Sequence, residues 1–227
     1  LKGKNTRDSR PPSKTVVPHP CHILHADVLT LNELDVNGHK YCLCVVDGKT
    51  AKCVVHLLKD KSDVKLVFPD IVAMFERQGG HPVLRVRTDR GGEFMNAELQ
   101  LYFRAMGIIY EHTAGHSSES NGVAERMNRT LMDKARTMVK AASVPTNWWG
   151  YALIMANQLH NWIPVSTKHT RSSPDEAFHG VTPNLSYLQP FGAVAYVHVP
   201  TALRKKLDDH VVKGTLIGFA EPLARTR

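Results

Sequence analysis

Short runs rich in apolar residues, bounded by turn residues, dominate the first third of the chain, a pattern typical of β-strands. These runs span residues 22–29, 40–47 and 53–58. An Asn-Gly pair at 37–38 and an Asp-Gly pair at 47–48 separate them and predict tight turns. Strands joined by short turns are usually antiparallel neighbours, so we expect a three-stranded meander here.

Helical spacing of apolar residues then takes over, interrupted by two more strand-like runs. The predicted helices cover about 62–77, 97–106, 121–142 and 146–162, and the strand-like runs are 83–88 and 108–112. Pro69 lies inside the first of these helices, which predicts a kink or a later helix start. This order of elements predicts an α/β layered domain over residues 21–165.

The two ends of the chain differ from this core. Residues 1–20 are polar, basic and rich in proline, and are predicted to form an extended arm. After a connector at 166–187, a small β-rich unit at 188–220 is predicted from strand-like runs at 193–199 and 211–219. A chain of 227 residues can bury one substantial core together with such a unit.

Charge, hydropathy and cysteine usage indicate which partners and which kinds of site the chain could have. The formal charge is +8, of which residues 1–14 carry +4 and residues 201–227 carry +3. Basic ends on a near-neutral body predict either contact with a polyanion or ordinary solvated tails. No apolar run is long enough to predict a transmembrane helix. The four cysteines form no C-x-x-C pair and are predicted to be buried free thiols; they are Cys21, Cys42, Cys44 and Cys53.

Three carboxylates carry the candidate chemistry. Asp27 lies in an early strand, and Asp89 follows the strand-like run at 83–88. Glu125 lies near the start of a helix and is separated from Asp89 by thirty-five residues. Three carboxylates brought together need cations, and two Mg²⁺ ions with phosphoryl transfer are the usual partnership. A structural reading remains open, because Asp-x-Gly-Gly is a turn signal and Asp often caps a strand end. Other acids offer alternatives, namely Asp35, Asp47, Glu93, Glu111 and Glu119.

The helix at 121–142 is predicted to be amphipathic with a basic ridge. Its core stripe would contain Ala124, Met127, Leu131, Ala135, Met138 and Ala142. Glu125 falls at the seam between this stripe and solvent. The candidate nucleic-acid contacts are Asn121, Arg126, Arg129, Arg136 and Lys140. The alternative is a solvated basic face with a salt-bridged glutamate.

Several ordered motifs resemble the integrase of copia-type long-terminal-repeat retrotransposons. They are HADV at 25–28, TDRGGEF at 88–94, NGVAERMNRTL at 121–131, WW at 148–149, FG at 191–192 and AYVHVP at 195–200. The resemblance covers nearly the whole chain. It implies an α/β ribonuclease H-like fold with a mixed five-stranded sheet flanked by helices, followed by an SH3-like unit at 188–220.

The resemblance also implies an activity. Asp27, Asp89 and Glu125 would form a D, D-35-E site that binds two Mg²⁺ (or Mn²⁺) ions. Such enzymes are endonucleases and polynucleotidyl transferases that trim the 3′ ends of the element's DNA and join them to target DNA. Expected partners are both DNAs and further copies of the chain, without a membrane. A zinc-binding module would precede residue 1 in a Pol polyprotein, and the protein would act in the nucleus after a stage in cytoplasmic particles.

Departures from the family pattern keep a second hypothesis open. Arg90 occupies a position where the family usually has Asn, and Gly115 and Ser118 occupy positions of frequent prolines. Glu119 replaces a usual Gln, and Thr30 replaces a frequent glycine. The chain could therefore be a catalytically inactive, decayed or domesticated nucleic-acid-binding domain. A ribonuclease H-type nuclease is a third hypothesis, which the long basic helix disfavours.

Overall fold

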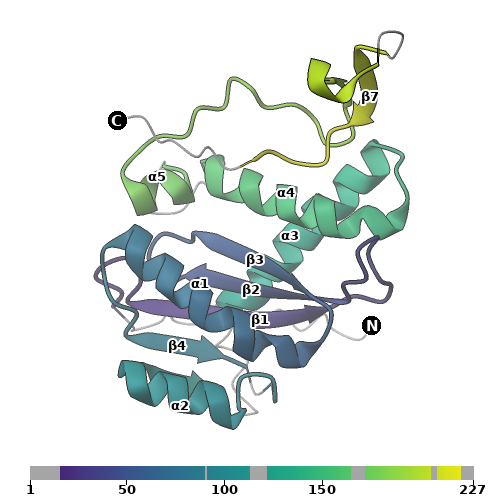
Figure 1. Ribbon diagram of the computed structural model, residues 1–227. Coiled ribbons are helices and arrows are strands. Elements are labelled where there is room, and N and C mark those ends of the chain that lie inside the picture. Colours follow the sequence, from purple (N-terminus) through teal and green to yellow (C-terminus); the bar gives the residue numbers. More distant parts are fainter. Residues whose placement is uncertain (1–15, 90, 113–121, 165–171, 206–208, 221–227) are drawn as a thin grey trace, which may run out of the picture.

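A mixed five-stranded sheet between two layers of helices forms the body of the molecule (Figure 1). The computed structural model describes residues 16–89, 91–112, 122–164, 172–205 and 209–220. The strand order across the sheet is β3-β2-β1-β4-β5. The strands are β1 (Ile23–Thr30), β2 (Tyr41–Asp47), β3 (Cys53–Leu58), β4 (Arg85–Thr88) and β5 (Ile109–His112).

The pairing explains why the sheet is mixed. Strands β1, β2 and β3 form the antiparallel meander that the turn signals predict. Strands β4 and β5 each follow a helix and return parallel to β1. The carboxyl ends of β1, β4 and β5 therefore point to one edge of the sheet.

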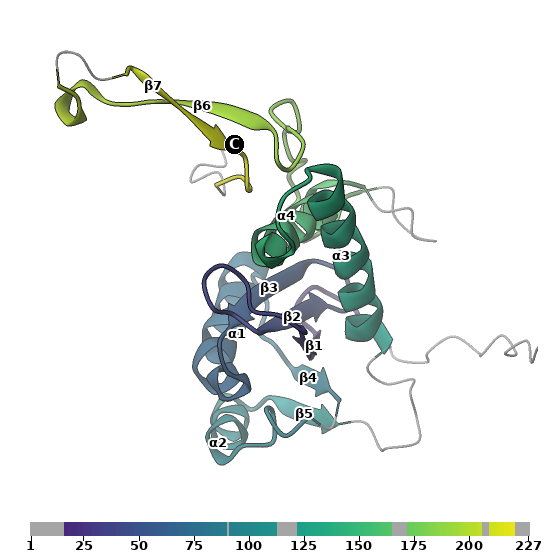
Figure 2. The ribbon, with the colours of Figure 1, turned by 90° about the vertical axis from the view of Figure 1, so that its right-hand side faces the viewer.

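The helices cover both faces of this sheet. They are α1 (Val64–Gly79), α2 (Ala97–Met106), α3 (Gly122–Ala141) and α4 (Trp149–Trp162), with short 3-10 turns at Lys61–Asp63 and Thr146–Trp148. Figure 2 shows α1 and α2 on one face, and α3 with α4 on the other. Each face has its own apolar cluster, one built around Phe68 and Phe75 and the other around Leu131 and Leu153.

Local sequence signals explain the helix ends. Helix α1 continues through Pro69 and starts at Val64, two residues later than predicted from the pattern. The later start places Pro69 in the second turn of the helix. Gly80 and Gly107 end α1 and α2 in the left-handed conformation, with φ of 69° and 67°.

The region after α4 contains a helix that the sequence reading missed, α5 (Pro174–His179), inside the predicted connector. Two further strands, β6 (Val194–His198) and β7 (Val211–Thr215), pair antiparallel, and a 3-10 turn lies at Thr201–Leu203. The side chains of both strands are mostly exposed. Among the described residues this unit is a two-stranded sheet, so its SH3-like character and the domain boundaries stay predictions.

Two other predictions can be compared with the structure. All four cysteines are buried and free, as predicted. No helix in the described ranges is long and apolar enough to cross a membrane. Residues 1–15 of the predicted arm at 1–20 lie outside the described residues. The whole predicted loop at 113–120 lies outside them as well.

Candidate active site

Asp27, inside β1, and Asp89, directly after the end of β4, lie side by side on neighbouring strands. The parallel register pairs Ala26 with Thr88, so Asp27 and Asp89 occupy the next position along both strands. Ala26 packs into the cluster beneath α1, and alternation along the strand therefore turns Asp27 to the opposite face, toward α3.

Asp27 is a half-buried carboxylate with few hydrogen-bond donors. Its Oδ2 accepts a 2.8 Å hydrogen bond from Nδ2 of Asn128, and its Oδ1 accepts one of 3.0 Å from the Val28 amide. Burial and, to a smaller extent, the negative charges of Asp89 and Glu125 raise the pKa of Asp27 to about 6. The hydrogen bonds from Asn128 and Val28 act in the opposite direction. The hydrogen bond from Asn128 also ties Asp27 to α3, the helix that carries Glu125.

Asp89 makes the turn contact of the structural role that the sequence left open, and it also lies next to Asp27 across the strand pair. Its Oδ1 accepts a 2.9 Å hydrogen bond from the Gly91 amide, which is the expected turn contact. Thr88 precedes it and donates through Oγ1 to the Asp89 carbonyl at 2.7 Å. These contacts fix the backbone at the end of β4, and Asp89 is still partly exposed beside Asp27.

Glu125 lies in the first turn of α3 and is exposed. Its effect on the pKa of Asp27 is smaller than that of Asp89, so it is the weaker electrostatic neighbour of the two. The stripe below it packs largely as predicted. The buried positions are Ala124, Met127, Leu131 and Ala135, while Val139 is buried in place of the half-buried Met138 and Ala142.

The three carboxylates fit divalent metal by their chemistry, although their positions are not those of a closed metal site. Carboxylate oxygens are the ligands that Mg²⁺ prefers. A cation would also relieve the repulsion that raises the pKa of Asp27. Among the described residues, however, no three His, Cys, Asp or Glu side chains are close enough to hold an ion as they stand. If an ion binds here, Asp27 and Asp89, which lie on neighbouring strands, would be its first ligands.

The competing acids within the described residues have structural partners. Asp35 accepts from the amides of Asn37 and His39, and Asp47 accepts from the amides of Cys21 and Thr50. In the same way, Glu111 binds Arg85 and Arg87, and Glu93 lies 3.9 Å from Lys61. Glu119 lies outside the described residues. Asp27 and Asp89 also accept hydrogen bonds, so their adjacent places on paired strands, rather than a lack of partners, set them apart.

The predicted basic ridge runs along the exposed side of α3. Arg126, Arg129, Arg136 and Lys140 are all exposed. Arg136 shares its charge with Asp133 through a 2.9 Å ion pair. Asn121 lies outside the described residues. The structure thus presents cations beside the carboxylates but does not by itself show a nucleic-acid contact.

Two features near the site were missed from the sequence. Asn128 lies on the buried stripe of α3, four residues after Ala124 and three before Leu131, and this spacing could have revealed it. His25 is buried two residues before Asp27; burial lowers its pKa to about 4, with smaller contributions from Arg87 and Arg126. His25 lies on the same face of β1 as Asp27, and Asn128 lies on α3, which packs over that face.

Comparison with known proteins identifies the family. The model of the integrase core domain matches residues 17–118. A Retrovirus-related Pol polyprotein from transposon TNT 1-94 of Nicotiana tabacum is 35% identical over 200 residues, which cover 88% of this chain. The chain belongs to the integrases of retrotransposon Pol polyproteins. A second relative, the Pol polyprotein of transposon RE1 from Arabidopsis thaliana, is 29% identical over 201 residues, or 88% of the chain.

The chain spans only a small part of these relatives, 15% of the tobacco protein and 14% of the Arabidopsis protein. Solved structures agree on the fold. The magnesium-bound catalytic core domain of HTLV-2 integrase gives a TM-score of 0.54 at 18% identity, covering 71% of this chain and 99% of that one. A simian T-cell lymphotropic virus intasome in complex with PP2A regulatory subunit B56 gamma gives 0.58 at 18% identity, covering 87% of this chain and 68% of that one. The core of this integrase therefore has the predicted ribonuclease H-like fold.

Proposed function

We propose that this integrase chain cuts and joins DNA strands by metal-dependent phosphoryl transfer at Asp27, Asp89 and Glu125. The observation that supports this most is the strand register that places Asp27 beside Asp89, together with the hydrogen bond that ties Asp27 to α3, the helix of Glu125. A structural aspartate is usually held charged by donors, as Asp35 is, and its pKa is lowered. The pKa of Asp27 is instead raised, mainly by burial and in smaller part by the negative charges of Asp89 and Glu125, and a bound cation would favour its charged form.

The residues of the chain divide the work as follows. Asp27 and Asp89 would hold the cations and Glu125 would complete the ligand set, while Asn128 fixes the orientation of Asp27 through its 2.8 Å hydrogen bond. When bound, two Mg²⁺ ions supply activation of the attacking oxygen and stabilisation of the leaving oxygen. The exposed cations of α3 bind the phosphate backbone and place the scissile bond over the carboxylates.

The two reactions share one chemistry. In the first, a water oxygen attacks a phosphorus near the DNA 3′ end, and the bond to the adjoining 3′ oxygen breaks. In the second, the freed 3′-hydroxyl attacks a phosphorus of target DNA, and again one P–O bond forms while another breaks. We further propose that several copies of the chain act together on paired ends, and that joining takes place in the nucleus because the target is chromosomal DNA.

Asp89→Asn tests the assignment. The substitution keeps the Gly91 turn contact, because the Asn carbonyl oxygen still accepts from that amide, but it removes the charge. We expect joining of labelled oligonucleotide ends to be abolished while binding to the same DNA is retained. Joining by the purified variant at the wild-type rate would refute the site, and DNA binding without joining by the wild type would favour the inactive binding domain.

A further inference from the structure

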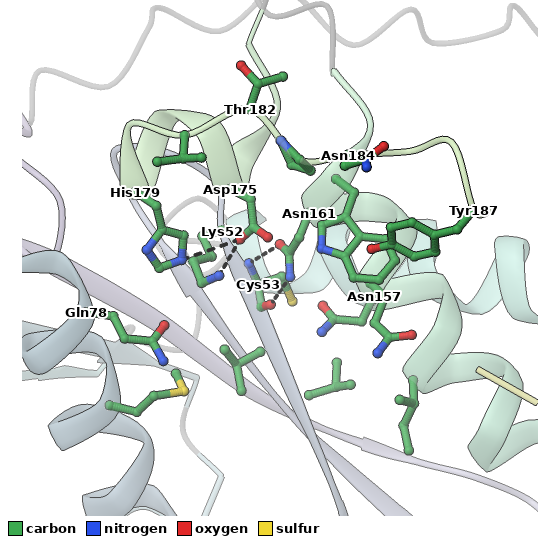
Figure 3. Close-up of a pocket in the computed structure, with 18 residues that line it drawn as sticks. Lys52, Cys53, Gln78, Asn157, Asn161, Asp175, His179, Thr182, Asn184 and Tyr187 are labelled. Carbon is green, nitrogen blue, oxygen red and sulfur yellow. Dashed lines mark hydrogen bonds and ion pairs between the residues drawn. The ribbon is translucent and has the colours of Figure 1, made fainter. Parts of the chain in front are cut away.

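Two sets of polar side chains in the described part of the chain lie outside the proposed chemistry. One lines a cavity of about 460 Å³ beside the edge strand β3, where the charged side chains of Lys52 and Asp175 pair with each other (Figure 3). The three candidate carboxylates are not among the residues that line this cavity. The other set is the pair of hydroxyl groups of Thr88 and Tyr110, which leads to the backbone of Asp89 and therefore bears on the site.

The two hydroxyl groups form a chain of hydrogen bonds with a defined direction. Oγ1 of Thr88 donates to the Asp89 carbonyl at 2.7 Å and lies 2.9 Å from the hydroxyl oxygen of Tyr110. A hydroxyl group has only one proton to donate. Because Thr88 gives its proton to Asp89, it accepts from Tyr110, and the tyrosine hydroxyl is the donor at the start of the chain.

This chain supports Asp89 from the buried side of the sheet. Thr88 is fully buried and pairs in register with Ala26, which packs into the cluster beneath α1. Tyr110 packs against the same cluster from β5. Side chains alternate between the two faces of a strand, so both hydroxyl groups lie on the face opposite to Asp27. They can therefore hold the backbone of Asp89 without occupying the side on which Asp27 lies.

Asp89 needs such support because it lies beyond the paired part of β4. The register of β4 with β1 and with β5 ends at Thr88. Among the described residues, the Asp89 carbonyl accepts from the Thr88 side chain in place of a backbone amide of a neighbouring strand. Its carboxylate accepts from the Gly91 amide at 2.9 Å. The direction in which Asp89 leaves the sheet thus depends on the hydroxyl groups behind it.

The ring of Tyr110 is held in place, and its hydroxyl group keeps its proton. The ring stacks on Phe103 of α2, with 5.2 Å between the ring centres and 9° between the ring planes. Burial raises the pKa of Tyr110; the hydrogen bond with Thr88 opposes this rise, and the charge of Asp89 adds to it. The hydroxyl group is therefore protonated at neutral pH and acts as a donor.

We propose that Tyr110 and Thr88 are positioning residues for Asp89, an inference that rests on the proposed role of Asp89 as a metal ligand. Their effect passes through the backbone, because the chain of hydroxyl groups fixes the carbonyl and with it the direction of the carboxylate. The alternative is an ordinary core tyrosine whose hydroxyl group pairs with the nearest acceptor. Such a tyrosine would affect the stability of the fold but not the affinity of the folded chain for a divalent ion.

Tyr110→Phe distinguishes these readings, because it removes the hydroxyl group and keeps the stacked ring. Binding of Mn²⁺ to the purified chain is measured by electron paramagnetic resonance, which detects the free ion and requires neither DNA nor catalysis. We expect about tenfold weaker binding than in wild type, the lower end of the usual effect of losing an outer hydrogen bond. Tyr102→Phe makes the same change on α2 against the same apolar cluster, and this control should bind like wild type.

A second pair of variants changes the middle of the chain. Thr88→Val removes both hydrogen bonds at nearly the same shape and should weaken Mn²⁺ binding at least as much as Tyr110→Phe. Thr88→Ser keeps the hydroxyl group and should recover most of the affinity. Urea unfolding of each variant without metal separates a loss of stability from a loss of affinity in the folded chain.

Asp89→Asn separates the failure of this inference from the failure of the proposed function. If wild type binds no Mn²⁺, or binds it no better than Asp89→Asn, the metal site is wrong and the positioning role falls with it. If Asp89→Asn weakens binding while Tyr110→Phe retains the wild-type affinity, only the positioning role is overturned. An equal loss in Tyr110→Phe and Tyr102→Phe would overturn it as well.

Discussion

Asn128 and Asp27, which are 101 positions apart in the sequence, are joined by a 2.8 Å hydrogen bond from the side-chain Nδ2 of Asn128 to Oδ2 of Asp27. The bond connects the second turn of α3 to β1, the central strand of the sheet. It opposes the burial and the like charges that raise the pKa of Asp27. Asn128 is therefore a positioning residue for the proposed metal ligand.

Asn128→Ala should weaken the site without removing a ligand. Loss of an outer hydrogen bond of this kind typically lowers metal affinity or activity about 10- to 100-fold. We expect a higher Mg²⁺ concentration at half-maximal joining, and Asn128→Gln should recover part of the loss. Thr137→Ala, an exposed change on the same helix, is the control. An unchanged Mg²⁺ dependence in Asn128→Ala would show that the bond has only a structural role.

The pKa of Asp27 predicts a pH dependence of stability. A carboxyl group whose pKa rises from 3.8 to about 6 on folding stabilises the fold when protonated, and this stability is lost as pH rises between those values. Asp27→Asn removes that loss. Its stability relative to wild type should therefore grow by about 2 kcal/mol from pH 4 to pH 7. His25 is present in both proteins, so its own titration cancels in the comparison.

Urea unfolding at a series of pH values measures this difference. Mg²⁺ at neutral pH should narrow it, because a bound cation favours the charged form of Asp27. A difference that stays constant across the pH range would mean that Asp27 titrates normally. It would then also remove the main support for a cluster of mutually repelling carboxylates.

The buried ion pair between Lys52 and Asp175 should matter for stability. Both side chains are about one-tenth exposed, and the Lys52 ammonium also lies 5.5 Å from the centre of the Phe178 ring. Lys52→Met leaves a buried carboxylate without its partner, so we expect a loss of about 3 kcal/mol in the free energy of unfolding.

The exposed pair of Arg136 and Asp133 provides the matched control for this experiment. Arg136→Met should cost less than about 1 kcal/mol, because exposed ion pairs are screened by solvent. Equal losses in the two variants, measured by chemical denaturation, would show that burial does not distinguish the pairs.

The basic ridge of α3 predicts a salt-dependent contact with DNA. Each phosphate contact that is lost should reduce the slope of log affinity against log salt by about 0.9. Arg129→Met should show such a reduction, whereas Arg77→Met, an exposed change at the end of α1, should not. Fluorescence anisotropy at several salt concentrations measures both slopes, and equal slopes would exclude Arg129 from the interface.

Most of the core could be predicted because its patterns are local. The strands β1 to β3 follow short apolar runs bounded by turn signals, and α2 ends at Gly107 as predicted. Helix α5 was missed because it has only six residues, although Ser173 and Glu176 form a capping box that was visible in the sequence. The parallel return of β4 depends on packing and was implied only by the family resemblance.

The candidate site could be predicted in part, because some of its signals are local in the sequence. Its three carboxylates lie in ordered motifs, whereas the hydrogen bond from Asn128 joins distant segments and depends on the fold. The pair of Lys52 and Asp175 is separated by 123 positions, so no local pattern indicates it. Sequence also did not predict that, among the described residues, the carboxylates form no group of three close enough to hold an ion as they stand.

The most direct test of the account is joining of labelled DNA ends by the purified chain with Mg²⁺ or Mn²⁺, comparing wild type with Glu125→Gln. Glu125 is exposed, so the substitution should leave the fold and DNA binding intact while it removes one charged ligand. Metal-dependent joining by wild type that is lost in Glu125→Gln is the predicted result. Joining that persists in Glu125→Gln, or that proceeds in wild type without added metal, would contradict the account.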